Sequence, residues 1–177
     1  SSIVHDPRII WNTLDVVKQN NGLSVQSKTG HVFMKEKMRE VNAIYGGEIS
    51  AHHYFRDFFF CDSGMIPWLL VLELLSNKNK PISYLIEQRK KLFLSSGEIN
   101  LKIDNPQLAM KRVKDHFICT CLSQDYTDGL SFTFEGWRFN LRESNTESLV
   151  RLNVECTSNQ AFLDKRVQDV KRFLISK

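Results

Sequence analysis

Two polar loops of the chain carry residue types that bind ligands. Segment 142–146 places a guanidinium, two hydroxyls, an amide and backbone N–H groups between two strand-like runs. A phosphate dianion is the ligand that uses all of these donors together. An ordinary polar hairpin loop has a similar composition, so the expectation depends mainly on the arginine. The expected phosphate ligands are Arg142, Ser144, Asn145 and Thr146.

The second loop, 46–53, carries groups that hydrogen-bond neutral hydroxyls. Glu48 and Ser50 lie two residues apart, so in an extended loop they face the same side. A carboxylate there can accept hydrogen bonds from two vicinal sugar hydroxyls. Alternatively, this is a surface loop in which Glu48 only accepts backbone N–H bonds. Gly46-Gly47 indicates either close ligand approach or a tight turn. Together the two loops predict a sugar phosphate ligand.

Three further residues are weaker candidates for the same ligand. His31 follows Thr29-Gly30 at an expected helix start, where N–H groups attract anions, although a lone histidine there is often a structural cap. His52 and His53 are adjacent, so at most one faces the ligand, and His52 is a candidate for proton handling. Arg8 is either a second phosphate ligand or a solvated charge at a helix start.

The chain offers no recognisable catalytic group. Asp57, Asp62 and Glu73 do not form a defensible catalytic pair, and there is no nucleophile elbow or Walker loop. The four cysteines lack metal-ligand spacing, and we expect no metal site. The sequence therefore predicts binding without chemistry.

Composition restricts the class of protein. The 177 residues are 42% hydrophobic and include 12 Phe, which suits one domain or two small ones with a real core. The 24 basic and 20 acidic residues are interleaved, so we expect no nucleic-acid partner. No signal peptide opens the chain, and the longest apolar run, Met65–Leu75, is too short to span a membrane, so we expect a cytoplasmic protein. The chain starts without Met in a strand-like run, so we expect an upstream segment.

The first half of the chain alternates strand-like and helix-like segments. Strands are expected at 3–4, 23–26 and 43–45, with helices at about 10–17, after Pro7 in a first helical turn, and about 32–41. Short connections of this kind predict a mainly parallel sheet, with the polar loops sharing its carboxyl edge. An aromatic loop follows at 54–60. A helix from Asp62-Ser63 to Leu75 is apolar nearly all round, so we expect it to be buried.

The pattern changes at Ser95-Ser96-Gly97, which we take as the domain boundary. Beyond it we expect a strand over 98–103, a helix capped by Asn105, three strands of alternating apolar residues, and a final helix capped by Asn159. This half predicts an antiparallel meander with helices on one face.

Taken together, the loops resemble the carboxyl-terminal half of a bacterial phosphomannomutase/phosphoglucomutase of the α-D-phosphohexomutase superfamily. The segments that carry the resemblance are His5-Asp6-Pro7-Arg8, Ser27–His31, Gly46–Asp57 and Arg142–Glu147. The sugar loop resembles the family's GEMSxH motif and the last loop its RxSNTxP motif. Three residues depart from the family pattern. Ile49 stands where Met is usual, Ala51 where some relatives have Gly, and Ser148 where Pro often follows the phosphate loop. A phosphoglucosamine mutase is disfavoured by the continuation Ala51–Tyr54.

The resemblance implies a fold and a role for each half. Residues 1–94 would be most of the third, sugar-binding domain, a three-layer α/β domain that is N-terminally incomplete. Residues 97–177 would be the fourth, phosphate-binding domain, similar in fold to the TATA-binding protein. The phosphoserine loop and the Mg²⁺ loop of the family belong to missing N-terminal domains, which would be partners of this chain.

The whole enzyme would interconvert mannose or glucose 6-phosphate and 1-phosphate through a hexose 1,6-bisphosphate and feed GDP-mannose biosynthesis. This chain alone would be inactive and would bind no cofactor. By resemblance, the first set of residues would contact the sugar and the second the phosphate that does not react. The first set is Arg8, His31, Glu48, Ser50 and His52; the second is Arg142, Ser144, Asn145 and Thr146. The alternative is a stand-alone, non-catalytic protein that binds sugar phosphates.

Overall fold

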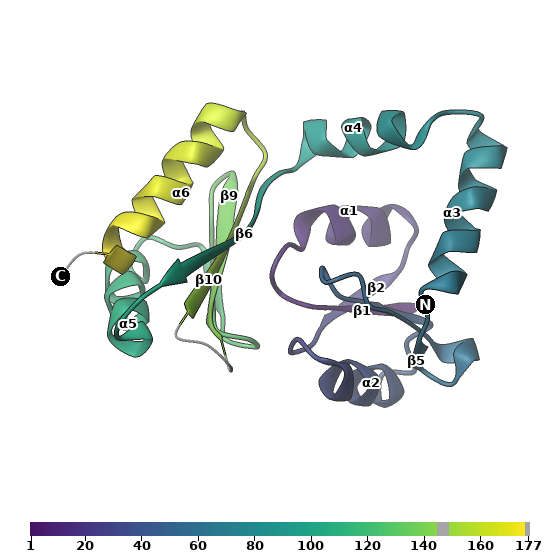
Figure 1. Ribbon diagram of the computed structural model, residues 1–177, viewed down its shortest axis with the longest axis horizontal. Coiled ribbons are helices and arrows are strands. Elements are labelled where there is room, and N and C mark those ends of the chain that lie inside the picture. The colour runs from purple at the N-terminus through teal and green to yellow at the C-terminus, as the bar shows by residue number, and fades with distance from the viewer. Residues whose placement is uncertain (145–148, 176–177) are drawn as a thin grey trace. The chain divides into compact units, whose positions relative to one another are not determined.

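The computed structural model describes residues 1–144 and 149–175 and divides into two compact units, Ser1–Lys91 and Leu92–Lys177. Each unit has its own sheet and its own hydrophobic core (Figure 1). The two units correspond in architecture to the expected α/β half and the expected antiparallel half.

The first unit contains a mixed five-stranded sheet in the order β2-β1-β3-β4-β5. β1 pairs in parallel with β2 and β3, while β4 and β5 extend the sheet with antiparallel pairing. The helices α1 and α2 lie on opposite sides of the sheet (Figure 1), which gives the expected three layers. The strands and helices of this part are β1 (Ser2–His5), α1 (Trp11–Gln19), β2 (Leu23–Gln26), α2 (His31–Glu40), β3 (Tyr45–Gly47), β4 (His53–Phe55), β5 (Cys61–Asp62), α3 (Met65–Lys78) and α4 (Ile82–Leu92).

Three local expectations for this sheet were wrong. Pro7 does not begin a helix, because α1 starts four residues later at Trp11. The third strand starts at Tyr45 rather than Ala43, whose side chain is buried in the turn before it. The segment expected as an aromatic loop forms β4 and a 3-10 turn, Arg56–Phe58, before β5. Strands of two or three residues show no alternation that a sequence pattern could reveal.

Gly46 lies within β3 because α2 packs directly on it. A Cβ atom at Gly46 would lie 2.5 Å from Sδ of Met38, and Met34 is also close. Met34 and Met38 are the buried residues of α2 and, together with Val4, Ala43 and Tyr54, form the small core of this unit. The glycine therefore permits close helix–sheet packing rather than a tight turn.

Helix α3 is not buried, contrary to expectation. None of its residues is buried, and its side chains from Trp68 to Leu72 are each more than one-third exposed. The helix is apolar on all sides, as the sequence suggested, but the described elements provide no second layer to cover it. Apolar composition therefore predicted the helix correctly and its burial incorrectly.

Helix α4 is anchored to α1 by a single arginine. Nε of Arg89 donates to Oδ1 of Asn12, and Nη2 donates to Oδ2 of Asp15, both at 2.6 Å. The connection links residues more than seventy positions apart and fixes the end of the first unit on its own α/β layer.

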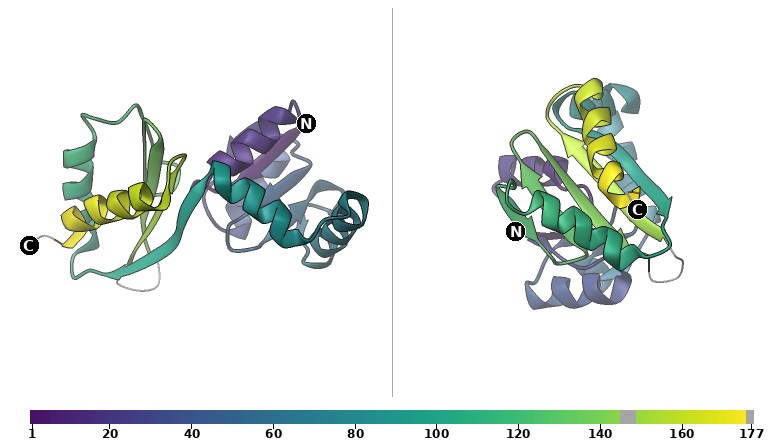
Figure 2. Two further views of the ribbon diagram at one scale, coloured as in Figure 1. Left: turned by 90° about the horizontal axis from the view of Figure 1, so that it is seen from above. Right: turned by 90° about the vertical axis from the view of Figure 1, so that its left-hand side faces the viewer.

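The second unit contains an antiparallel five-stranded sheet in the order β6-β10-β9-β8-β7, with α5 and α6 on one face (Figure 2). Asn105 and Asn159 cap these helices as expected, since each side chain accepts a backbone N–H of the first turn. Its elements are β6 (Leu94–Lys102), α5 (Pro106–Phe117), β7 (Ser123–Asp125), β8 (Leu130–Phe134), β9 (Trp137–Glu143), β10 (Leu149–Cys156) and α6 (Gln160–Ile175).

The core of this unit is built from the alternating residues read in the sequence. Alternate apolar residues of β8, β9 and β10 point towards the helices and are buried. The expected helix stripes are also buried, from Ala109 to Phe117 on α5 and from Leu163 to Leu174 on α6. Fold class is therefore confirmed for both units.

The segment expected as a domain boundary, Ser95–Gly97, lies inside β6. It forms a bulge: the pairing with β10 shifts register near Asn153, and Gly97 has a φ of +66°. Oγ of Ser96 accepts the backbone N–H of Val154, and the amide of Asn153 donates to the carbonyl of Gly97. In the structure these small polar residues form an irregular part of a strand.

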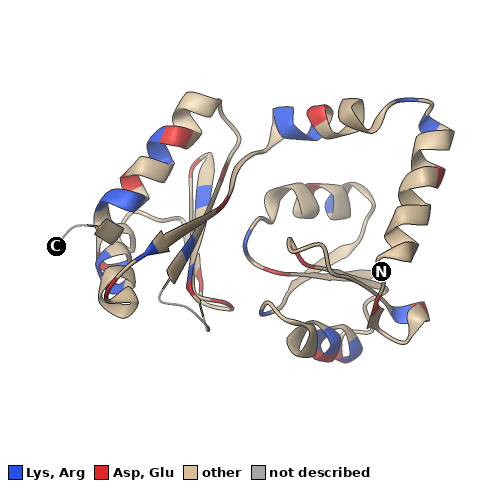
Figure 3. Cartoon of the chain, viewed as in Figure 1, with Lys and Arg blue, Asp and Glu red and all other residues tan. Residues whose placement is uncertain are grey.

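Acidic and basic residues are interspersed along α6, whereas α3 carries only one of each (Figure 3). Over residues 1–144 and 149–175, no helix combines the length and the hydropathy that crossing a bilayer requires.

Candidate functional site

The loops after β1, β2 and β3 meet at one edge of the first sheet, as expected for parallel strands. Oδ2 of Asp6 accepts the backbone N–H of Ile49 at 2.8 Å, which links the first loop to the third. The backbone N–H of Gly30 donates to Oε2 of Glu48 at 2.9 Å, which links the second to the third. Two buried carboxylates therefore hold the three loops together.

Glu48 is largely buried, and both of its carboxylate oxygens have partners within the protein. Oε1 accepts the hydroxyl of Tyr54 at 2.6 Å, and Oε2 accepts the N–H of Gly30. Burial and the bond to Glu48 raise the pKa of Tyr54, so the phenol stays protonated and donates. Glu48 therefore acts structurally in the loop. Its expected contact with sugar hydroxyls stays a prediction that would use its remaining lone pairs.

Arg8 is buried and paired with Asp6. Its Nη2 donates to Oδ2 of Asp6 at 2.7 Å, and its backbone N–H donates to Oδ1. The hydroxyl of Ser50, which is itself exposed, lies 3.5 Å from the same Nη2. The reading of Arg8 as a solvated charge at a helix start was wrong, because it is neither solvated nor in α1.

The structure separates the two adjacent histidines. The ring of His52 lies 5.2 Å from that of His31, which is the first residue of α2, and 6.4 Å from that of Tyr54. His53 points to a different neighbour, since its Nδ1 lies 2.6 Å from the hydroxyl of Tyr45. Of the two, His52 therefore lies with the other candidate residues of this edge.

Asp62 also belongs to this group of side chains, although the sequence reasoning weighed it only as a catalytic acid or a helix cap and not as a partner of His52. Its Oδ2 lies 2.6 Å from Nδ1 of His52, and its Oδ1 accepts the backbone N–H of His53 at 2.9 Å. Burial alone would raise the pKa of Asp62, but these two hydrogen bonds outweigh it and lower the pKa below its usual range. No sequence signal marks the contact, which depends on the antiparallel pairing of β4 with β5.

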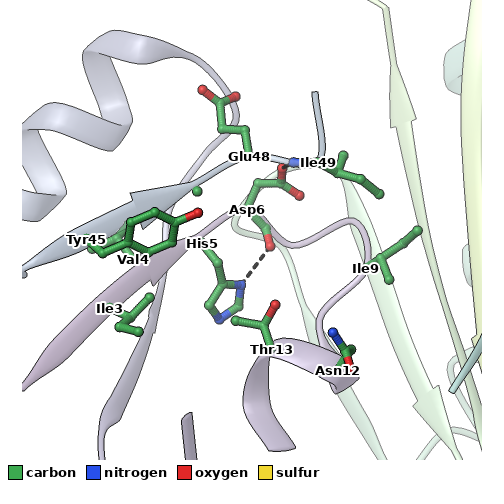
Figure 4. A pocket seen from close by; sticks show the side chains of 11 residues that line it. Ile3, Val4, His5, Asp6, Ile9, Asn12, Thr13, Tyr45, Glu48 and Ile49 are labelled. Carbon is green, nitrogen blue, oxygen red and sulfur yellow. Dashed lines mark hydrogen bonds between the residues drawn. The ribbon is translucent and has the colours of Figure 1, made fainter. Parts of the chain in front are cut away.

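A cavity of about 220 Å³ lies on the α1 side of the same edge (Figure 4). Its lining side chains include His5, Thr13 and Tyr45. The carboxylate of Glu48 points away from these side chains (Figure 4). The cavity is therefore distinct from the group around His31 and His52.

The polar face of the second sheet carries the expected arginine. Because side chains alternate along β9, Arg138, Asn140 and Arg142 lie on the face opposite the helices. Arg142 lies directly opposite Arg151 of β10, and Glu98 of β6 contacts both, at 3.8 and 3.6 Å. Arg142 also lies 3.8 Å from Asp128. The sequence analysis did not identify Arg151 as a candidate ligand, because only the pairing register of β10 with β9 places it opposite Arg142.

A buried ion pair continues this polar face. Nη1 of Arg138 lies 2.6 Å from Oε1 of Glu155, and each side chain is only 1% exposed. The amide of Asn140 donates to the hydroxyl of Ser131 at 3.0 Å. Arg138 is thus paired with Glu155. Two arginines, Arg142 and Arg151, lie side by side near the end of β9.

Ser144 lies in the middle of the predicted phosphate loop, segment 142–146. Its backbone N–H donates to the carbonyl of Leu149, which closes the β9–β10 hairpin. Its Oγ is buried and has no hydrogen-bond partner among residues 1–144 and 149–175. The other predicted ligands of this loop, Asn145 and Thr146, lie outside the described residues, as does Ser148.

Metal ligands are not grouped in the part of the chain that the structure describes. No three His, Cys, Asp or Glu side chains there come together in a way that could hold an ion. The four cysteines form no disulfide, and only Cys156 is fully buried.

Comparison with known proteins assigns both units. Residues 1–93 match the family model described as phosphoglucomutase/phosphomannomutase, alpha/beta/alpha domain III. Residues 98–172 match that described as phosphoglucomutase/phosphomannomutase, C-terminal domain.

Curated relatives and solved structures agree with these matches. The chain is 54% identical over 174 residues to a phosphomannomutase of Escherichia coli K12 and 53% identical over 175 residues to one of Vibrio cholerae. Each match covers 98% of this chain but 38% of the relative, so the chain spans little more than a third of these proteins. A phosphoglucomutase/phosphomannomutase family protein from Burkholderia thailandensis superposes with a TM-score of 0.80 at 28% identity, over 98% of this chain and 37% of that one. The chain belongs to the phosphoglucomutase/phosphomannomutase family.

Proposed function

We propose that this chain is the substrate-recognition part of a phosphomannomutase/phosphoglucomutase and that it binds hexose phosphates. The family membership and the relatives named phosphomannomutase support this reading, and mannose phosphates are the first ligands to test. The whole enzyme would interconvert hexose 6-phosphate and hexose 1-phosphate through a 1,6-bisphosphate, in the cytoplasm, and supply GDP-mannose synthesis.

In the second unit, the ligand would be the phosphate group that does not react. The observation that carries this proposal is the pair Arg142 and Arg151, placed opposite each other where β9 leads into residues 144–148. Guanidinium groups bind phosphate through charge-assisted, bidentate hydrogen bonds. The buried Oγ of Ser144, unpaired within the described residues, adds a donor at the same end. Asn145 and Thr146 would complete the set.

In the first unit, the ligand would be the sugar. Ser50, His31 and His52 are at least partly exposed at the strand-end edge and can reach hydroxyl groups. Glu48 and Arg8 lie behind them, where they hold the loops and contribute charge. A site that binds only the hydroxyl groups common to glucose and mannose would accept both sugars.

Phosphoryl transfer needs groups that this chain does not contribute. The phosphoserine and the Mg²⁺ that the family resemblance implies would belong to other domains of the whole enzyme. No cluster of three His, Cys, Asp or Glu side chains among the described residues fits a metal ion. The chain's own contribution would be to hold the substrate in place, which is a large part of phosphoryl-transfer catalysis.

Phosphorus NMR with mannose 1-phosphate and glucose 1-phosphate tests the proposal directly. The wild-type chain should shift the phosphate resonance on titration and should form no 6-phosphate. Arg142→Ala should weaken binding about tenfold or more, since hydrogen bonds to charged groups contribute about 1.5–3 kcal/mol. Lys111→Ala, which removes an exposed charge from α5, should bind as the wild type does. Turnover by the chain alone, or no binding at millimolar ligand, would contradict the proposal.

A further inference from the structure

We infer that Asp62 is a positioning residue that fixes the tautomer of His52, so that Nε2 of this histidine accepts a hydrogen bond from a sugar hydroxyl. Asp62 lies outside the segments that carry the family resemblance. The role towards the sugar rests on the proposed function, whereas the tautomer can be established without any ligand.

Asp62 and His52 form a short hydrogen bond. Oδ2 of Asp62 and Nδ1 of His52 are 2.6 Å apart. An ionised carboxylate can only accept hydrogen bonds, so Nδ1 must carry the proton. The lowered pKa of Asp62 keeps the carboxylate ionised at neutral pH. In neutral His52 the lone pair is therefore on Nε2.

Asp62 is itself held in place by the β4–β5 pairing. Its Oδ1 accepts the backbone N–H of His53, and its backbone lies opposite Tyr54 in the β4–β5 pairing. The carboxylate is thus fixed by a sheet and not by one side-chain contact. A group held at both oxygens can orient a ring more firmly than a mobile surface acid could.

The ring of His52 lies near the rings of His31 and Tyr54. The ring of His31 lies 5.2 Å away at the start of α2, and that of Tyr54 lies 6.4 Å away. Tyr54 is committed to Glu48, to which its hydroxyl donates at 2.6 Å. His52 is 41% exposed, and no hydrogen bond to its Nε2 comes from the described residues. Nε2 is therefore the ring nitrogen left for a ligand.

The tautomer of His52 determines which kind of ligand group its Nε2 can bind. A histidine with Nε2–H would donate to a phosphate or to a hydroxyl oxygen, whereas one with a bare Nε2 accepts from a hydroxyl. Asp62 selects the acceptor form, which suits a neutral hydroxyl.

Asp62→Asn tests the inference most directly. The amide has the same shape as the carboxylate, but it reverses the direction of the hydrogen bond with Nδ1 of His52. Oδ1 of Asn can still accept from the N–H of His53, but its NH₂ group donates to Nδ1 of His52. The tautomer should therefore change from Nδ1–H to Nε2–H. Long-range ¹H–¹⁵N NMR of the histidine rings, on the full 177-residue chain at pH 8, reads this directly. His53 should be unchanged in the same spectra, and Asp57→Asn, at an exposed acid of the same segment, should leave His52 as in the wild type.

Ligand binding is measured on the same proteins. Asp62→Asn should weaken the binding of glucose 1-phosphate about tenfold at pH 8, and Asp57→Asn should not. The loss of affinity should accompany the change of tautomer, which a role of Asp62 in folding alone would not produce.

The possible outcomes separate the two proposals. Nε2–H in the wild type overturns the inference whatever the ligand does. The expected tautomer, reversed by Asp62→Asn with the expected loss of affinity, supports it. A reversed tautomer with unchanged affinity overturns the role towards the sugar. If the wild type has the expected tautomer but binds no hexose phosphate, the proposed function fails, and the role of Nε2 fails with it. Should Asp62→Asn not fold, Asp62→Glu, which keeps the carboxylate, must retain Nδ1–H.

Discussion

Arg142 and Arg151 lie directly opposite each other on neighbouring antiparallel strands, and the carboxylate of Glu98 is shared between them, at 3.8 and 3.6 Å. Like charges placed opposite in a sheet repel and are destabilising. Asp128 also lies 3.8 Å from Arg142, so two carboxylates face the two guanidinium groups and offset their repulsion. A phosphate dianion would have to compete with these carboxylates for the arginines.

Glu98 and a phosphate should therefore compete for the same arginines. Glu98→Gln should tighten the binding of mannose 1-phosphate several-fold, while Arg151→Ala should weaken it several-fold, because each charge contributes about 1 kcal/mol near a surface. Isothermal titration at low and at high salt measures both, and each effect should diminish with salt. A weaker ligand affinity in Glu98→Gln would contradict this competition.

The hydroxyl of Tyr54 should stabilise the first unit. It is fully buried and donates to the carboxylate of Glu48, so Tyr54→Phe leaves a buried charge with one hydrogen bond fewer. We expect a loss of about 1.5–3 kcal/mol in the free energy of unfolding, measured by urea denaturation. Tyr84→Phe is the matched control, since Tyr84 is 45% exposed, and it should change stability by less than about 0.5 kcal/mol. Equal effects of the two substitutions would show that the bond to Glu48 contributes nothing.

Asp62 should contribute to the loss of folding stability as the pH falls into the acid range. Because its pKa is lowered in the folded protein, its contribution is present above the pKa of the unfolded chain and is lost as the pH falls through the folded value. The group is 30% exposed, so we expect about 0.5–1 kcal/mol. Urea denaturation between pH 7 and pH 3 should show a shallower acid loss for Asp62→Asn than for the wild type. Asp57→Asn, at a side chain 89% exposed, should follow the wild-type curve.

Two glycines of the second unit separate backbone strain from steric overlap. Gly97 and Gly129 both have positive φ, at +66° and +82°. A Cβ atom at Gly97 would meet open space, whereas one at Gly129 would lie 2.3 Å from the carbonyl oxygen of Leu141. Gly97→Ala should therefore cost about 1 kcal/mol of unfolding free energy, from strain alone. Gly129→Ala should cost at least about 2 kcal/mol more, because β8 and β9 must separate. Thermal unfolding of the two variants gives the comparison, and equal losses would refute the steric part.

Local pattern determined much of the fold. Alternating apolar residues identified the buried faces of β8, β9 and β10, and the helix stripes identified those of α5 and α6. Asn105 and Asn159 marked helix starts because a cap involves only residues three apart. The family resemblance, carried by short motifs, is confirmed by the matches over both units.

Features that depend on long-range pairing were not accessible in this way. The contacts of Asp62 with His52 and of Arg142 with Arg151 exist because separate strands pair in one register, which no single segment encodes. The exposure of α3 depends on which elements lie against it, although its apolar character could be read directly. The sequence left open whether Glu48 binds sugar hydroxyls or accepts backbone N–H bonds. In the structure its buried carboxylate accepts the N–H of Gly30 and the hydroxyl of Tyr54.

The amino-acid sequence by itself thus determined which residue types are present and the local elements that carry them, because these depend on neighbours within a few positions along the chain. The tertiary structure decided which charges are paired, which ring nitrogen of His52 is engaged, and which polar groups are buried. These properties arise from through-space distances between segments far apart in sequence, and electrostatic interactions change steeply with such distances.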